Sequence, residues 1–171
     1  MAEITIGSPA IDRPIQQLSS SSTRLTKNGL ANGTGKINYF AVYVGATGSI
    51  FGLKMGTFQD NGSENYTSRD YATLGDVSPG FQSFSGLDVD VVTNDLLGFY
   101  MSSGYPVYTS DAGANSYSFL TGDQFGTTNT YSASSSTRYY SVYGSGATSK
   151  KWNGITISKW NGIVASKINN I

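Results

Sequence analysis

Short runs in which apolar residues recur at strand-like spacing cover most of this 171-residue chain. Residues 36–44 and 96–101 are apolar on both faces, which is typical of central strands in a sandwich or of strands at a subunit interface. Residues 81–92 instead alternate apolar with polar or acidic side chains, as a half-buried strand does. Turn-forming residues such as Asn-Gly separate these runs roughly every ten residues.

The same pattern predicts the remaining strands and the connections between them. Further strands are expected at residues 23–26, 49–59, 66–74, 117–120 and 138–143, and no segment has helical periodicity. The four consecutive serines at 19–22 and the segments 75–80, 105–110 and 123–136 are interpreted as loops or linkers. Gly144-Ser145-Gly146 is interpreted as the separator between body and tail. The sequence therefore predicts an all-β, antiparallel, jelly-roll-like sandwich at 23–146, an extended leader and linker at 1–22, and a tail at 147–171.

The tail is an eight-residue repeat. Residues 151–158 read Lys-Trp-Asn-Gly-Ile-Thr-Ile-Ser, residues 159–166 read Lys-Trp-Asn-Gly-Ile-Val-Ala-Ser, and residues 167–171 are a truncated third copy. A period of eight fits neither an α-helix nor a coiled coil, so short extended runs joined by Asn-Gly turns are expected. One copy cannot bury its own Trp and Ile, which predicts an assembly or anchoring element, with a disordered terminus as the alternative. The predicted contact residues are Lys151, Trp152, Ile155, Ile157, Lys159, Trp160, Ile163 and Ile168.

The composition argues against an enzyme. The chain has no Cys and no His, so a standard catalytic triad or thiolate metal site has no residues to form it. Asp88 and Asp90 fall on one strand face and could form a carboxylate pair like that of glycosidases, but a solvated polar face is the favoured interpretation. The prediction is a non-enzymatic protein with no cofactor.

Charge is unevenly distributed along the chain although the formal net charge is zero. All eleven carboxylates lie in residues 1–123, whereas residues 124–171 hold five basic residues and no carboxylate. The basic tail is therefore suited to an acidic surface or to a neighbouring subunit. Lysines eight residues apart are too sparse for a nucleic-acid patch, so no nucleic acid is expected as a partner.

The chain shows neither a secretory signal nor a membrane span. Residues 1–9 lack the apolar core of a signal peptide, and no run approaches the length of a transmembrane helix. Arrival outside a cell would therefore need another route, such as release of assembled virus particles by lysis.

Two kinds of ligand site remain as hypotheses. Aromatic residues in polar, loop-like surroundings could stack on glycans, or could instead cap the core or line a subunit interface; they are Tyr105, Tyr108, Tyr117, Phe125 and Tyr131. No metal site is predicted with defined spacing, and the nearest candidate is Ca²⁺ at Asp88, Asp90 and Asp95.

Two segments of the body and the repeats of the tail resemble bacteriophage virion proteins. Residues 6–13 (Ile-Gly-Ser-Pro-Ala-Ile-Asp-Arg) and 94–104 (Asn-Asp-Leu-Leu-Gly-Phe-Tyr-Met-Ser-Ser-Gly) are similar to parts of phage jelly-roll modules. The tail resembles the Lys-x-Asn-Gly repeats that end many virion proteins. The resemblance implies a structural protein on the virion surface, extracellular after release: a capsid decoration, a head fibre or a tail-associated module. It also implies a homo-oligomer, for example a trimer, with other virion proteins as partners. A carbohydrate-binding adhesion module and a subunit of an extracellular filament are the alternatives.

Overall fold

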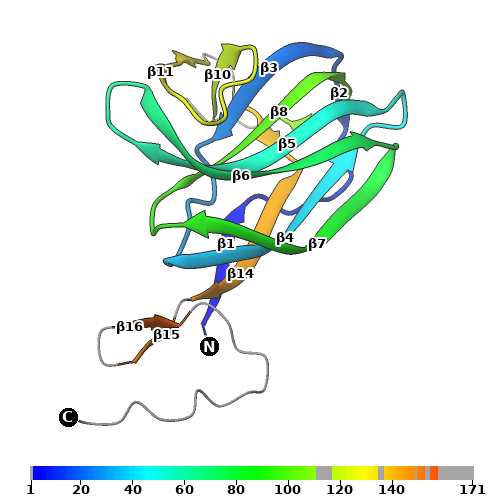
Figure 1. Cartoon of the computed structure of the whole chain (residues 1–171). Coiled ribbons are helices and arrows are strands. Elements are labelled where there is room, and N and C mark those ends of the chain that lie inside the picture. Colours follow the sequence, from blue (N-terminus) through cyan, green and yellow to red (C-terminus); the bar gives the residue numbers. More distant parts are fainter. Residues whose placement is uncertain (1, 111–116, 135–136, 149, 153–154, 158–171) are drawn as a thin grey trace, which may run out of the picture.

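The computed structural model describes residues 2–110, 117–134, 137–148, 150–152 and 155–157 (Figure 1). Within these ranges the chain forms strands and turns and no helix, which confirms the predicted all-β class. The strands are β1 (Glu3–Gly7), β2 (Ile15–Gln16), β3 (Ser19–Thr26), β4 (Gly35–Val44), β5 (Ile50–Asp60), β6 (Asn65–Val77), β7 (Gly80–Val91), β8 (Leu96–Gly104), β9 (Val107–Thr109), β10 (Tyr117–Thr121), β11 (Thr128–Thr130), β12 (Ser132–Ala133), β13 (Tyr139–Tyr140), β14 (Val142–Thr148), β15 (Lys150–Trp152) and β16 (Ile155–Ile157).

Eight of these strands form two antiparallel sheets with jelly-roll order. One sheet has the order β1-β14-β4-β7, and the other contains β6-β5-β8-β3 as its central part. In chain order the eight strands are β1, β3, β4, β5, β6, β7, β8 and β14. Numbered one to eight in that order, they follow 1-8-3-6 across the smaller sheet and 2-7-4-5 across the larger one. This is the arrangement of a jelly roll, so the predicted sandwich is confirmed.

The main hydrophobic core lies between the two sheets. Phe40 of β4 and Phe99 of β8 are among its fully buried side chains, together with Leu53 and Met55 of β5. Both strands predicted to be central are so: β4 lies between β14 and β7, and β8 lies between β5 and β3. For β8 the continuous apolar run reflects coverage of both strand faces, since Phe99 lies in the main core and Leu96 in a second cluster of buried residues. On β4 the face away from the main core is only partly covered, because Tyr39 and Tyr43 are half-buried.

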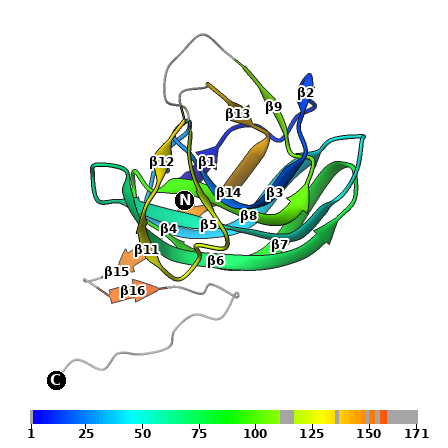
Figure 2. The same cartoon turned by 90° about the horizontal axis from the view of Figure 1, so that it is seen from above.

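A second core covers the outer face of the larger sheet. The connection from β8 to β14 is an insertion in the jelly roll. In it, β10 extends the sheet beside β3 (Figure 1), and β11 extends it beside β6 (Figure 2). Phe125 and Tyr131 of this insertion pack on Leu25 and Phe58, with 5.1 Å between the ring centroids of Phe58 and Phe125. The large residues that stand alone in the polar stretch 123–136 are therefore core residues.

The predicted leader and linker belong to the body. β1 pairs with β14, and its Ile4 and Ile6 are buried in the main core. The serine run is the beginning of β3, where Ser19 pairs with Gly104 and Ser22 pairs with Met101. The linker prediction was wrong because the partner strands supply the backbone hydrogen bonds that a serine run does not signal by itself.

The predicted separator 144–146 is also strand, in the middle of β14. A side chain on Gly146 would collide with the carbonyl oxygen of Lys36, and Gly144 lies against Phe40 and Ile6. These glycines therefore permit close strand approach and do not mark a linker. The body continues to Thr148, two residues beyond the predicted boundary.

Two other predicted loops are shorter in the structure. β6 extends to Val77 and β7 begins at Gly80, so residues 78–79 alone join them. Within residues 105–110 the chain forms β9, which lies between β13 and β2 in a small three-stranded sheet. The polar composition of these two segments led to the loop predictions. Short strands and strand ends at a sheet edge can form with few apolar residues.

Candidate functional site

Both termini of the body leave the jelly roll at the same end. Because β1 is antiparallel to β14, Glu3 lies opposite Ala147, and the Thr148 amide donates to the Ala2 carbonyl at 3.4 Å. Across the same sheet Thr148 lies opposite Gly35 of β4, which lies opposite Val91 of β7. We call this the exit end: the ends of β1 and β14 together with the loops 27–34, 61–64 and 92–95 (Figure 1).

Backbone hydrogen bonds hold the loops of the exit end together. The Ala31 amide donates to the Asp95 carbonyl at 2.9 Å, and the Asn94 amide donates to the Ala31 carbonyl at 2.8 Å. Asn94 has a φ of 72°, a left-handed conformation that Asn tolerates better than most residues. Thr34 and Thr93 join the same loops through their hydroxyls at 3.1 Å. The exit end is thus a fixed surface.

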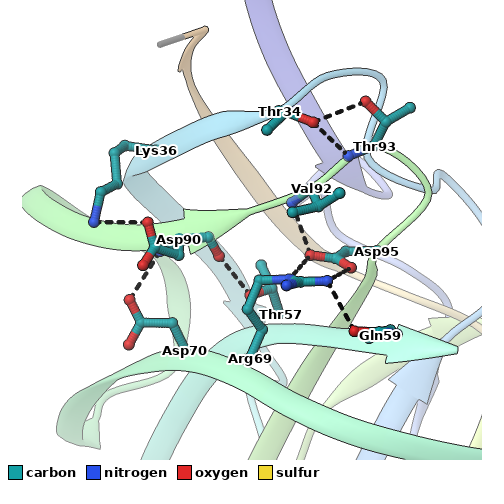
Figure 3. A network of polar contacts seen from close by, with 10 residues as sticks. All are labelled: Thr34, Lys36, Thr57, Gln59, Arg69, Asp70, Asp90, Val92, Thr93 and Asp95. Carbon is teal, nitrogen blue, oxygen red and sulfur yellow. Dashed lines mark hydrogen bonds and ion pairs between the residues drawn. The ribbon is translucent and has the colours of Figure 1, made fainter. Parts of the chain in front are cut away.

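An arginine and a buried aspartate form the centre of this end (Figure 3). The Asp95 carboxylate accepts from Arg69 Nε at 2.6 Å and from Arg69 Nη2 at 3.0 Å, and also from the Val92 amide at 2.8 Å. Arg69 Nη2 also donates to the side-chain oxygen of Gln59 at 3.3 Å. The two-pronged contact fixes the plane of the guanidinium. One face of the loop 92–95 is therefore tied to β5 and β6.

A hollow of about 360 Å³ opens beside this ion pair. Its walls combine an apolar surface from Val92, which is 37% exposed, with amide, guanidinium and carboxylate groups. The residues that line it include Gln59, Asp60, Arg69, Val92, Asn94 and Asp95. A hollow lined in this way suits a peptide in which an apolar side chain is next to a polar or charged residue.

The three aspartates named as the nearest calcium candidate bind cationic side chains. Asp88 and Asp90 both bind Lys36, at 3.3 Å and 2.8 Å, and Asp95 binds Arg69. In the part of the chain that the structure describes, no group of three or more acidic, His or Cys side chains is placed to hold a metal ion. Alternation along β7 places Asp88 and Asp90 outward, whereas the following turn directs Asp95 inward, so the three carboxylates face different surroundings.

A second polar cluster joins the insertion to the exit end. Glu64 accepts from Lys27 at 2.5 Å, from the Tyr66 hydroxyl at 3.2 Å, and from Ser118, a fully buried residue of β10. Burial alone would raise the pKa of Glu64, but the hydrogen bonds from Lys27 and Ser118 outweigh it and lower that pKa below its ordinary value. The Glu64 carbonyl also accepts from the Tyr131 amide. Glu64 therefore links three elements.

The exit end is acidic as a whole. Carboxylates near it outnumber cations: Glu3, Asp60, Glu64, Asp70, Asp88, Asp90 and Asp95 against Lys27, Lys36 and Arg69. The opposite end and the outer sheet face hold the other carboxylates of the body that the structure describes, Asp12, Asp76 and Asp123, of which Asp123 is paired with Lys54. The acidic excess that the sequence places in the body is thus concentrated where the basic tail begins.

The aromatic candidates for glycan contact are mostly core residues. Tyr108, Tyr117, Phe125 and Tyr131 are each less than 9% exposed, whereas Tyr105 is half-buried. These four therefore lack the exposed ring faces that glycan stacking needs, since the insertion that carries Tyr117, Phe125 and Tyr131 folds back on the sheet and Tyr108 faces the main core.

Two further tyrosines, Tyr140 and Tyr71, also contact other side chains of the body. Tyr140 packs against Tyr108 and Tyr117, and burial raises the pKa of Tyr140 to about 12. On the outer sheet face Tyr71 is 39% exposed, but Phe125 and the Lys54 ammonium already contact its ring. These contacts match the alternative in which the tyrosines cap the core.

The first repeat of the tail begins as a pair of strands. β15 and β16 are antiparallel, with Lys151 opposite Thr156 and Trp152 opposite Ile155, so two residues separate the innermost pair. This register agrees with the extended runs predicted on either side of Asn-Gly. Lys159, Trp160, Ile163 and Ile168 lie outside the described residues, as do the side-chain positions of β15 and β16.

The residues that organise the exit end carry only a weak signal in the sequence. Arg69, Lys27 and Glu64 are not among the predicted site residues, although Glu64 is one of only two glutamates. Their partners lie 26 to 54 residues away in the chain, which spacing within a motif does not encode. The usable signal is a charged residue next to an Asn-Gly turn in a chain that has few charges.

Fold and site define a class of protein: a jelly-roll sandwich with an insertion and a basic repeat after its last strand. No protein-family model matches the chain, and a search of curated proteins finds no significant match. In the described part of the chain there is no helix of the length and apolarity needed to cross a membrane.

Proposed function

We propose that this chain is a non-enzymatic structural protein of a virus particle. Its jelly roll is displayed on the particle, and the repeats after Thr148 join it to sister chains or to another virion protein. The protein is then found on the virion surface and becomes extracellular on release.

The observation that carries this proposal is the common exit of both termini. β1 and β14 pair along their full common length, so any attachment made by the tail holds the jelly roll by one end. The loops at the opposite end then face away from the attachment. A body held by one end, with a basic tail that can dock on an acidic surface, suits display on a particle.

The polar groups of the body support a structural role. The ion pairs at the exit end join different elements: Lys27 with Glu64, Lys36 with Asp90, and Arg69 with Asp95. Each of these three carboxylates is paired with a cation from another element, and such pairs hold loops in place. Chemistry on a substrate instead favours groups with perturbed and complementary pKa values facing a cleft.

Removal of the tail tests the proposal. The full chain and a chain that ends at Thr148 are compared by sedimentation equilibrium and by co-sedimentation with purified virus particles that lack this protein. We expect the full chain to form a trimer or other oligomer, or to bind particles, and the shortened chain to do neither. Monomers that bind no particle with or without the tail would contradict the proposal.

A subunit of an extracellular filament is a second candidate, favoured by the open edge of β7. Among the described strands β7 pairs with β4 alone, whereas the other edge, β1, is covered by hydrogen bonds from residues 29–32. An open edge accepts a strand from another chain. Electron microscopy separates the two candidates, since strand addition without closure gives fibres of unlimited length and a virion protein gives closed oligomers.

A further inference from the structure

The exit end and the tail carry opposite charges. The exit end has seven carboxylates and three cations nearby, whereas residues 149–171 carry four lysines and no carboxylate. Since the whole chain has a formal net charge of zero, the tail compensates the acidic excess of the body. Two copies that met through their exit ends would repel each other unless the basic segments lay between them.

The exit end also has a place for a large side chain. The hollow between the β5–β6 region and the loop 92–95 exposes Val92 as an apolar wall. The guanidinium of Arg69, held flat by Asp95, lies in its lining. A guanidinium of fixed orientation is a good partner for an indole face. Asp60, at the rim, is exposed and can meet a lysine that precedes the indole.

Backbone groups for pairing lie next to this hollow. β7 ends at Val91, immediately before Val92, and its outer edge has no strand partner among the described residues. The Asp90 amide and carbonyl are bound by Asp70 and Thr57, so the edge is closed at that residue. Two residues earlier, the Asp88 carbonyl accepts from Lys36 Nζ at 3.5 Å, and the Asp88 side chain is exposed.

We propose that the exit end is the docking site for the C-terminal repeats, residues 150–171, of a second copy of this chain. A Lys-Trp pair of the partner's repeat enters the hollow, with the indole against Val92 and Arg69 and the lysine at Asp60. The remaining lysines lie near Asp88. This inference deepens the proposed function, on which it rests, by naming the surface that the tail binds.

A reciprocal arrangement explains why tail and site share one end. In a two-fold assembly the same surface occurs on both subunits, so each subunit gives its tail to the partner and binds the tail of the partner. With both the tail and its site at the exit end, two copies that meet end to end can exchange tails. The exchange brings four lysines to each acidic end, which removes the repulsion between the two bodies.

The tryptophans allow a direct test in the full chain. The chain has two, and both lie in the tail, so intrinsic tryptophan fluorescence reports on the tail alone. The test variant is Asp60→Asn with Asp88→Asn, and the matched control is Asp12→Asn with Asp76→Asn at the opposite end. Each pair removes two exposed carboxylates. Asn retains the side-chain oxygen with which Asp60 and Asp76 accept the Gly62 and Gly52 amides, so the fold is kept.

We expect the full chain to associate and to protect its tryptophans from acrylamide. The exit-end variant should weaken association by about tenfold and expose the tryptophans, because two screened charge pairs per site are lost. The control variant should behave like the unchanged chain, and added salt should act like the exit-end variant. Circular dichroism of all three proteins checks that the fold is unaltered.

Three outcomes would overturn the inference. If both double variants behave alike, the exit end is not the docking site; the proposed function survives in that case if loss of the tail still abolishes assembly. If the tryptophans are protected in a chain that stays monomeric, the repeats bind their own body. If shortening the chain at Thr148 changes neither mass nor particle binding, the proposed function fails as well.

Discussion

Asp95 is 2% exposed, and its carboxylate is paired with one cation, Arg69. Replacement of Asp95 by Asn keeps the shape of the side chain but leaves the guanidinium without its counter-charge. We expect the free energy of unfolding to fall by about 2 kcal/mol, because hydrogen bonds to a charged group are lost at a carboxylate that is buried while Arg69 is 26% exposed. Urea unfolding measures this loss.

Asp88 provides the control for this prediction. Its side chain is 70% exposed and 3.3 Å from Lys36, so Asp88→Asn should cost less than about 1 kcal/mol, as exposed ion pairs do. Equal losses in the two variants would show that Asp95 has no special structural role.

Glu64 makes stability depend on pH. Its pKa is lowered in the folded protein from the ordinary value of 4.5, so folding favours the carboxylate. The stabilisation is present above pH 4.5 and is lost as the pH falls through the lowered folded pKa. Glu64→Gln should therefore be less stable than the unchanged chain at pH 7, and the difference should shrink below pH 4.5. Urea unfolding at pH 7, 5 and 3 tests this, and a constant difference would contradict it.

At the scale of the element, β14 depends on close approach to β4. A side chain at Gly146 would collide with the Lys36 carbonyl oxygen, a backbone atom that cannot move away by a change of rotamer. Gly146→Ala should destabilise the fold by about 2 kcal/mol or more, as overpacking does. Gly33→Ala is the control, because its nearest neighbour is the Ile4 side chain at 3.3 Å. Thermal unfolding of both variants decides whether 144–146 acts as strand or as linker.

The insertion forms a second core, which Phe125 tests. Phe125 is 8% exposed and packs between Phe58 and Tyr71. Phe125→Ala should lower the free energy of unfolding by about 3 kcal/mol, as for other buried aromatic residues. Tyr105→Ala, at a half-buried position, should cost less. A neutral Phe125→Ala would instead favour the exposed aromatic surface that glycan binding needs.

At the scale of the whole molecule, both cores that the structure describes belong to the body. Among the residues whose burial is described, the buried hydrophobic ones run from Ile4 to Val142, so a chain that ends at Thr148 should unfold at the same urea concentration as the full monomer. A chain that ends at Gly146 should be less stable, because it loses the pairing of Ala147 and Thr148 with Glu3, Lys36 and Gly35. If both shortened chains were equally stable, the boundary would lie at 146.

The sequence alone determined the class of fold and most of its strands. Alternating apolar residues and Asn-Gly turns are local signals, and they placed β4, β5, β7 and β8 close to their observed bounds. The repeat and the separation of charge between body and tail are also properties of the linear chain. These features depend on neighbours a few residues apart, which is why a pattern along the chain reveals them.

Only the tertiary structure decided which residues meet. It made the serine run part of β3, turned Gly144 and Gly146 into contacts between strands, and buried Phe125 and Tyr131 under an insertion. It also placed Asp88 and Asp90 beside Lys36 and placed Asp95 beside Arg69. The physical reason is the same in each case: burial and pairing in a jelly roll come from strands distant in sequence, so no local pattern carries them.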